Sequence, residues 1–252
     1  MQRRLHIGAH GRAPRAEVKL PRRDFLKAAG AAGAAGAAAA TGLAACSPET
    51  KTTAAGPAAG PETWLVLTAQ EVAFFGAAAD TIIPKDELSP SGTECGIPAF
   101  IDRQLAGAWG GGAKMYRAGP FLKGTPEQGY QLALTPHQFF VAGVRAANEW
   151  SEKTYGKTFD RLEQAKRDEA LKAMEEGKAE FNGFDSKLFF TRLLTINMEG
   201  FFSDPIHGGN RNKASWRMLG FPGLPATYAD KVDAYRDKPY VVAEPQSIAD
   251  FS

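Results

Sequence analysis

Residues 185–202 read DSKLFFTRLLTINMEGFF and form the most apolar helical pattern of the chain. Asp185 and Ser186 are residue types that begin helices, because their side chains accept hydrogen bonds from free backbone N–H groups in the first turn. The large apolar side chains that follow recur at helical spacing: Leu188, Phe189, Leu193, Leu194, Ile196 and Met198. We therefore expect a helix from Asp185 to about Phe202 at the centre of the fold.

Two earlier helices have clear start signals. Thr68 and Glu71 have the spacing of a capping box, in which each side chain bonds to the other residue's backbone N–H. The stretch Thr135-Pro136-His137-Gln138 offers a cap, a proline in the first turn and a reciprocal partner. We expect the second of these helices to end near Tyr155, at Gly156.

Weaker patterns predict helices over Ala99–Trp109, Asp160–Glu176, Ala214–Leu219 and Ala226–Arg236, separated by stretches rich in Pro and Gly. No run alternates long enough to predict a strand. The tail from Pro239 to Ser252 is either an extended segment that lies over a partner or a frayed terminus. The predicted fold class is mainly α: residues 62–252 form a single compact helical domain with long irregular loops.

The N-terminal segment has the layout of an export signal rather than of a folded domain. Arg22 and Arg23 stand before Phe25, Leu26 and Lys27, and an uncharged Ala/Gly run continues to Ala45. Paired arginines are typical of the twin-arginine route. The run is too weakly apolar for a permanent membrane span. We expect residues 1–45 to be a twin-arginine signal peptide.

The signal ends in Leu43-Ala44-Ala45-Cys46, which resembles a bacterial lipoprotein box. Residues 46–61 consist mostly of Ala, Gly, Thr and Pro, so they suit a flexible linker between a lipid and a domain. The alternative is an ordinary cleavage site beside an incidental cysteine. We expect Cys46 to be lipidated and the protein to be periplasmic and anchored to the membrane.

Charge and missing motifs exclude several functions. The formal net charge is +2, but the basic excess lies in residues 1–45 and leaves a mildly acidic domain, which does not favour nucleic-acid binding. The sequence has no haem-attachment motif, dinucleotide loop, metal-ligand spacing or nucleophile elbow. We therefore expect no catalytic, cofactor-binding or metal-binding residues, although an acidic pair from distant segments stays open.

Cys95 is an unpaired cysteine if Cys46 carries lipid. Its setting, Gly92–Gly96, is typical of an exposed loop. In an oxidising compartment such a cysteine favours an intersubunit disulfide. A buried free cysteine is the other interpretation.

Residues 199–213 read EGFFSDPIHGGNRNK and predict a tight loop after the central helix. Asp204 precedes a proline, which disfavours helix, and Gly208-Gly209-Asn210 tolerates positive φ. The simplest interpretation is a loop that closes the fold.

This loop resembles the hallmark segment of the gluconate 2-dehydrogenase subunit 3 family, the small or gamma subunit. The shared features are the acidic-Gly-Phe-Phe lead, Asp204-Pro205, Gly208-Gly209-Asn210, Trp216 and Gly220-Phe221-Pro222-Gly223. A second similar region comprises Leu67–Glu71, Ala79–Pro84, Gly96–Pro98 and Phe100–Asp102.

The resemblance implies a subunit without a cofactor in an oxidoreductase complex associated with the membrane. The large partner of that family carries FAD, and a cytochrome c subunit with haem c takes the electrons. The small subunit brings the flavoprotein through the twin-arginine translocase. The loop residues expected to contact the partner are Asp204, His207, Gly208, Gly209, Asn210 and Trp216. A free-standing periplasmic ligand-binding lipoprotein is the alternative function.

Overall fold

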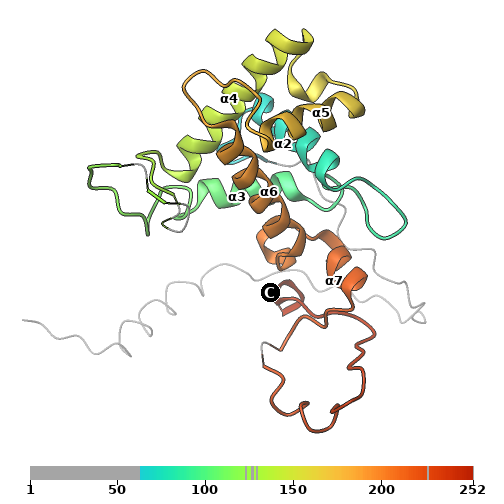
Figure 1. The fold of residues 1–252 in the computed structure, drawn as a ribbon. Helices are drawn as coiled ribbons and strands as arrows, with labels where there is room; N and C mark the ends of the chain where they lie inside the picture. The colour runs from blue at the N-terminus through green and yellow to red at the C-terminus, as the bar shows by residue number, and fades with distance from the viewer. Residues whose placement is uncertain (1–62, 123, 126–127, 129, 226, 252) are drawn as a thin grey trace, which may run out of the picture. The chain divides into compact units, whose positions relative to one another are not determined.

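The computed structural model of the 252-residue chain describes residues 63–122, 124–125, 128, 130–225 and 227–251 (Figure 1). The predicted signal peptide (Arg22, Arg23, Phe25, Leu26 and Lys27), Cys46 and the linker lie outside these residues.

The described part of the chain is a helical domain without β-strands, and its one isolated β-bridge joins Gly223 and Gln246. Its α-helices are α2 (Ala69–Ile82), α3 (Ile97–Ala106), α4 (Pro136–Tyr155), α5 (Gln164–Glu175), α6 (Ser186–Phe202) and α7 (Ala214–Leu219). Short 3-10 helices are η2 (Phe159–Arg161), η3 (Pro205–His207), η4 (Arg211–Lys213) and η5 (Ile248–Phe251). The predicted fold class is confirmed.

Helix α6 is the central element and contacts α2, α3, α4, α5 and α7 (Figure 1). Its Phe189 is fully buried. The ring of Phe189 lies 6.0–6.4 Å, centroid to centroid, from the rings of five other phenylalanines: Phe74, Phe139, Phe140, Phe181 and Phe184. These rings come from α2, α4, α6 and the loop after α5, so one aromatic cluster joins the helices.

The helix starts with strong local signals are confirmed. The Thr68 N–H donates to Glu71 Oε2 at 2.7 Å, and the Glu71 N–H donates back to Thr68 Oγ1 at 3.4 Å. Thr135 and Gln138 form the same reciprocal pair at the start of α4. Asp185 Oδ1 accepts from the Leu188 N–H at 2.9 Å and caps α6. Each cap satisfies backbone donors that a helix start leaves free.

Two predicted helix boundaries are wrong. The helix predicted from Asp160 begins only at Gln164, because Phe159 is fully buried and its N–H donates to Asn148 Oδ1 at 3.1 Å. This anchor holds Asp160 in the separate turn η2. The helix predicted to reach Trp109 ends at Ala106, where Gly107 is its C-cap and the chain turns back. Trp109 lies beyond this helix end and is 48% exposed.

The helix predicted over Ala226–Arg236 does not form. Residues 229–237 make successive turns instead. Val232 is 61% exposed and Tyr235 is 40% exposed, so the segment has no apolar face in the core. A short helix without tertiary packing is marginal in water, which explains the difference.

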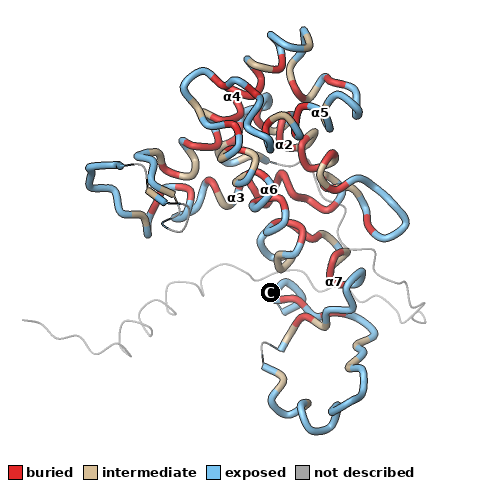
Figure 2. Tube along the Cα trace, in the orientation of Figure 1, coloured by how far each residue is buried: buried red, intermediate tan, exposed pale blue. Residues whose placement is uncertain are grey.

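Not every apolar side chain of α6 reaches the core. Leu194 and Met198, which follow the helical apolar spacing, are each 37% exposed, as is Phe202 one turn further on. Figure 2 shows buried and exposed parts along the same helix. Leu194, Met198 and Phe202 follow one another at spacings of four residues, so they share one helix face. We refer to these three residues as the α6 stripe.

None of the helices in the described part of the chain combines the length and apolarity needed to cross a membrane.

Candidate functional site: the loop after α6

Asn210 organises the loop that follows α6. Its side chain is fully buried, and its backbone is left-handed, with φ 45° and ψ 42°. Its Oδ1 accepts from the Ser215 N–H at 3.0 Å and from the Ser215 hydroxyl at 2.8 Å. Its Nδ2 donates to the Ser203 carbonyl at 2.9 Å. One amide thus joins the end of α6 to the start of α7.

Gly208 and Gly209 allow the loop to lie directly on its neighbours. Gly208 has φ 98°, which favours glycine. A Cβ on Gly208 would overlap the guanidinium of Arg103, and a Cβ on Gly209 would overlap the Gly200 carbonyl oxygen. Both glycines are buried, so they shape the loop from inside.

Trp216 closes the C-terminal end of α6. It is 7% exposed, and its Nε1–H donates to the Phe202 carbonyl at 3.0 Å. That carbonyl is one of the acceptors that a helix end leaves free. The Trp216 ring lies 5.1 Å from the Phe221 ring at an interplanar angle of 71°.

The fold brings the loop against the segment around Cys95. The Arg211 N–H donates to the Cys95 carbonyl at 3.0 Å. Gly96 has φ 81°, and a Cβ there would overlap the Gly208 carbonyl oxygen. Two regions more than a hundred residues apart in sequence therefore form one backbone junction.

Cys95 is a free cysteine in the hydrophobic core and is 1% exposed, so the predicted exposure is wrong. The junction with Arg211 and the packing of α3 cover it. Burial, with smaller contributions from the charges of Glu94 and Asp80, raises the pKa of its thiol to about 11. A thiol in this environment lacks the access that a disulfide with another subunit requires.

Asp204 connects the loop to the C-terminal tail. Its Oδ1 accepts from the Ile206 N–H at 3.0 Å, and its Oδ2 accepts from the Ile248 N–H at 2.9 Å. Lys213 forms an ion pair with Asp250 at 2.7 Å. Figure 1 shows the C-terminus beside this part of the chain. The tail is therefore neither frayed nor free, because it is bound to the loop.

The predicted contact residues divide into two groups. Gly208, Gly209, Asn210 and Trp216 are buried and shape the loop. His207 is exposed and Asp204 is half-buried, so these two reach the surface.

Asp102 is an important residue that the sequence did not single out. It is 2% exposed. Its carboxylate accepts from the N–H groups of Leu65, Val66 and Leu67 at 2.7, 3.0 and 2.9 Å and so holds the chain before α2 against α3. The sequence pointed to Asp102 only as part of the Phe100–Asp102 stretch, which belongs to the second region that resembles the family.

The described residues hold no group of three or more His, Cys, Asp or Glu side chains placed to bind a metal ion. Asn210 bonds within the loop and to Ser215, whereas Asp204 and Lys213 bond to the C-terminal tail. The hydrogen bonds of the loop hold its backbone in place and so fix the surface that the loop presents.

The chain is thus a small helical domain, and the hydrogen bonds of Asn210 with Ser203 and Ser215 hold the loop after α6 in shape. The family model for gluconate 2-dehydrogenase subunit 3 matches residues 69–223, and the chain belongs to that family. The match spans both the region from α2 to α3 and the loop after α6. No curated protein and no solved structure matches the chain.

Proposed function

We propose that this chain is a non-catalytic small subunit of a membrane-associated, FAD-dependent sugar or sugar-acid dehydrogenase complex. It binds the folded flavoprotein in the cytoplasm, brings it through the twin-arginine translocase and holds it at the periplasmic face through a lipid on Cys46. FAD and haem c belong to the partner subunits. The observation that carries this proposal is the family match over residues 69–223, which names a dehydrogenase subunit.

The α6 stripe is our candidate for the surface that binds the flavoprotein. Large apolar side chains that share one exposed face mark interaction sites. Ile206, 40% exposed, and His207 follow the stripe at the end of the helix. The buried network of Asn210 fixes the backbone that presents them. An interface here would bury the apolar side chains that the single chain leaves in water.

Co-purification tests this proposal. The chain is expressed with its affinity-tagged flavoprotein partner, either unchanged or with Met198→Glu in the middle of the stripe. We expect the unchanged pair to purify together and Met198→Glu to reduce recovery at least about tenfold, because an unpaired charge would be buried. Val141→Glu is the matched control, since Val141 is 36% exposed on another helix, α4.

The outcomes separate two claims. If Met198→Glu and Val141→Glu both leave recovery unchanged, the stripe is not the interface. If the unchanged chain purifies without any flavoprotein, the subunit function itself is wrong. The free-standing ligand-binding lipoprotein would then be favoured, and its supporting observation is a cavity beside Arg192.

A further inference from the structure

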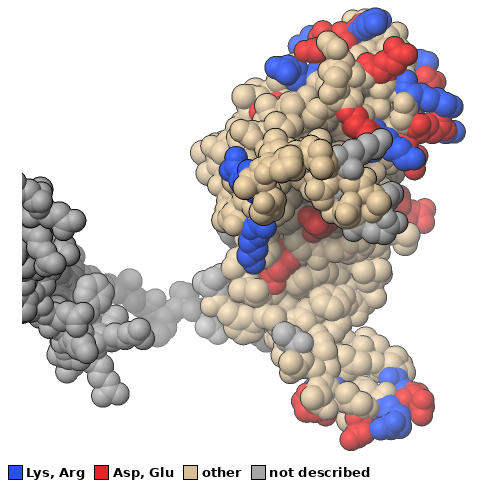
Figure 3. Space-filling model, turned by 60° about the vertical axis from the view of Figure 1, so that its left-hand side comes forward, with Lys and Arg blue, Asp and Glu red and all other residues tan. Residues whose placement is uncertain are grey.

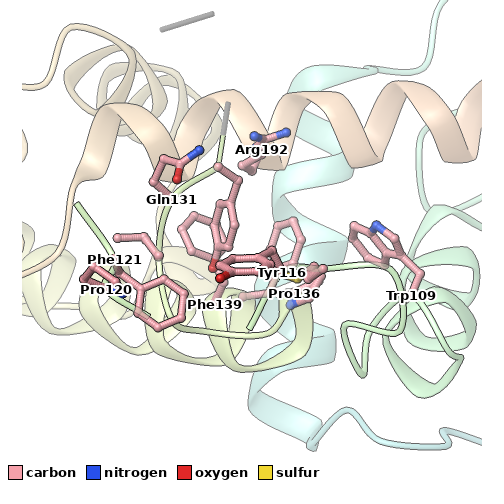
Figure 4. Close-up of a pocket in the computed structure, with 12 residues that line it drawn as sticks. Trp109, Tyr116, Pro120, Phe121, Gln131, Pro136, Phe139 and Arg192 are labelled. Carbon is pink, nitrogen blue, oxygen red and sulfur yellow. The ribbon is translucent and has the colours of Figure 1, made fainter. Parts of the chain in front are cut away.

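A cavity of about 350 Å³ opens between residues 115–121 and 130–132, α4 and α6 (Figure 4). It lies away from the loop after α6. In Figure 3, which brings this side of the domain forward, charged side chains gather at the two ends and leave a mostly uncharged band between them. The volume lies at the lower end of the range for sites that bind small molecules.

The wall of the cavity is mainly aromatic. Six rings line it: Trp109, Tyr116, Phe121, Tyr130, Phe139 and Phe140. Phe139 and Phe140 are buried and form the firm inner wall, whereas Tyr116 is 80% exposed and Phe121 is 41% exposed. Aromatic faces of this kind bind flat apolar groups by stacking and by burial of area.

Arg192 of α6 is the one charged side chain in the wall. Its Nε is buried and has no hydrogen-bond partner. Its guanidinium carbon lies 5.8 Å from the centroid of the Tyr130 ring. Among the described residues no carboxylate forms an ion pair with Arg192. Glu199 is near enough for an electrostatic effect only: burial raises the pKa of Glu199, and the charge of Arg192 partly offsets that rise.

Tyr130 does not neutralise this arginine. Its hydroxyl donates to the Leu134 carbonyl at 2.7 Å. Burial raises the pKa of Tyr130 to about 12, and the nearby charge of Arg192 only partly opposes that rise. The phenol therefore stays protonated at neutral pH, and a buried guanidinium N–H remains without an acceptor, which is costly.

We propose that the cavity binds a small molecule with a flat aromatic body and one carboxylate. The body would lie among the rings, and the carboxylate would accept hydrogen bonds from Arg192. A sugar acid fits less well, because each hydroxyl needs a partner and Gln131 is the only uncharged side-chain amide in the wall. The proposal is independent of whether the chain escorts a flavoprotein.

Calorimetry on the purified full chain tests the site with 2-naphthoate, its neutral isostere 2-naphthamide, and gluconate. We expect naphthoate to bind roughly tenfold to a hundredfold more tightly than naphthamide, as hydrogen bonds to a charged group would give. Gluconate should give no binding heat. Arg192→Gln should remove the preference for naphthoate but leave the weak binding of naphthamide.

Arg145→Gln is the matched control, because Arg145 is an exposed arginine on α4 whose ion pair with Glu149 is 3.8 Å long. It should bind all three probes as the unchanged chain does. Circular dichroism must show that Arg192→Gln is folded, and Arg192→Lys, which keeps the charge but loses the planar fork, should recover part of the preference. The proposal is overturned by equal binding of the two naphthyl probes, by their joint failure to bind at millimolar concentration, by unchanged naphthoate affinity in Arg192→Gln, or by tighter binding of gluconate.

Discussion

Asn210 holds three backbone or hydroxyl groups with a single amide, and its left-handed backbone is one that few residue types tolerate. Asparagine suits this position twice over, because it accepts positive φ more readily than most residues and offers both donors and acceptors. Because its amide bonds inward to Ser203 and Ser215, the Asn210 side chain is buried although neighbouring residues such as His207 lie at the surface.

Asn210→Ala should lower the free energy of unfolding by about 3 kcal/mol, because the buried N–H and hydroxyl of Ser215 would lose their acceptor and the Ser203 carbonyl would lose its donor. Urea unfolding followed by circular dichroism measures this loss. Asn212→Ala is the matched control, since Asn212 also has a left-handed backbone, with φ 56°, but is exposed. A control as destabilised as Asn210→Ala would show that backbone strain, and not the hydrogen bonds, sets the cost.

Cys95 should behave as a core side chain rather than as a reactive thiol. With a pKa of about 11, only about a thousandth of it is thiolate at pH 8. In a Cys46→Ser background the folded chain should therefore not react with Ellman's reagent until urea is added. A non-reducing gel of the native complex should show no heavier band that disappears when a reducing thiol is added. Such a band would support an intersubunit disulfide at Cys95.

Helix α6 packs in close contact with α4. A Cβ on Gly143 of α4 would overlap the ring of Phe189, so this glycine sets how near the two helices lie. Alanine is the better helix former by about 1 kcal/mol, yet overpacking a core costs about 1–3 kcal/mol. Packing should therefore decide the sign.

Gly143→Ala should destabilise the domain by about 2 kcal/mol in urea unfolding. Gly111→Ala provides the comparison, because its Cβ would meet nothing nearer than 3.6 Å and the residue is exposed. We expect almost no change there. A more stable Gly143→Ala chain would mean that α4 and α6 separate easily and that the aromatic cluster is not tightly packed.

The elements also show what a sequence can and cannot predict. The capping pairs at Thr68 and Thr135 were found because their partners lie three residues away. The late start of α5 was missed because it depends on Asn148 in another helix. The outward position of Met198 and the burial of Cys95 were missed for the same reason, since helical spacing does not say which apolar side chains find neighbours. The sequence predicted a loop after the central helix, but which of its residues point inward required the fold.

The C-terminal tail returns to the loop after α6. Lys213 pairs with Asp250 and Arg217 pairs with Glu244, at 2.7 and 2.5 Å. Lys213 and Arg217 hold the pKa of Asp250 and of Glu244 below their ordinary values of 3.8 and 4.5. The two ion pairs therefore stabilise the tail fully at pH values above these ordinary pKa values. Their contribution is lost as the pH falls through the lowered pKa values of the folded chain.

Hydrogen exchange corrected for its intrinsic pH dependence should show the tail opening in acid. The amide of Ile248 lies in this tail, so it should lose protection as Asp250 and Glu244 become protonated, at pH values below their ordinary pKa values of 3.8 and 4.5, while core amides of α6 keep theirs. Lys213→Gln should show the same loss at neutral pH, as its ties to Asp250 and Glu244 are absent. Protection of Ile248 that stays unchanged from pH 6 to pH 3 would contradict the account of the ion pairs.

We propose that this chain carries a flavoprotein out of the cytoplasm, and the location of that flavoprotein when the export signal is disabled tests the proposal. Arg22 and Arg23 are replaced together by lysine, and the FAD-containing partner is quantified in cytoplasmic and periplasmic fractions. We expect both proteins to remain in the cytoplasm, with the flavoprotein folded and loaded with FAD. Flavoprotein that reaches the periplasm in normal amounts while this chain stays behind would contradict the escort function.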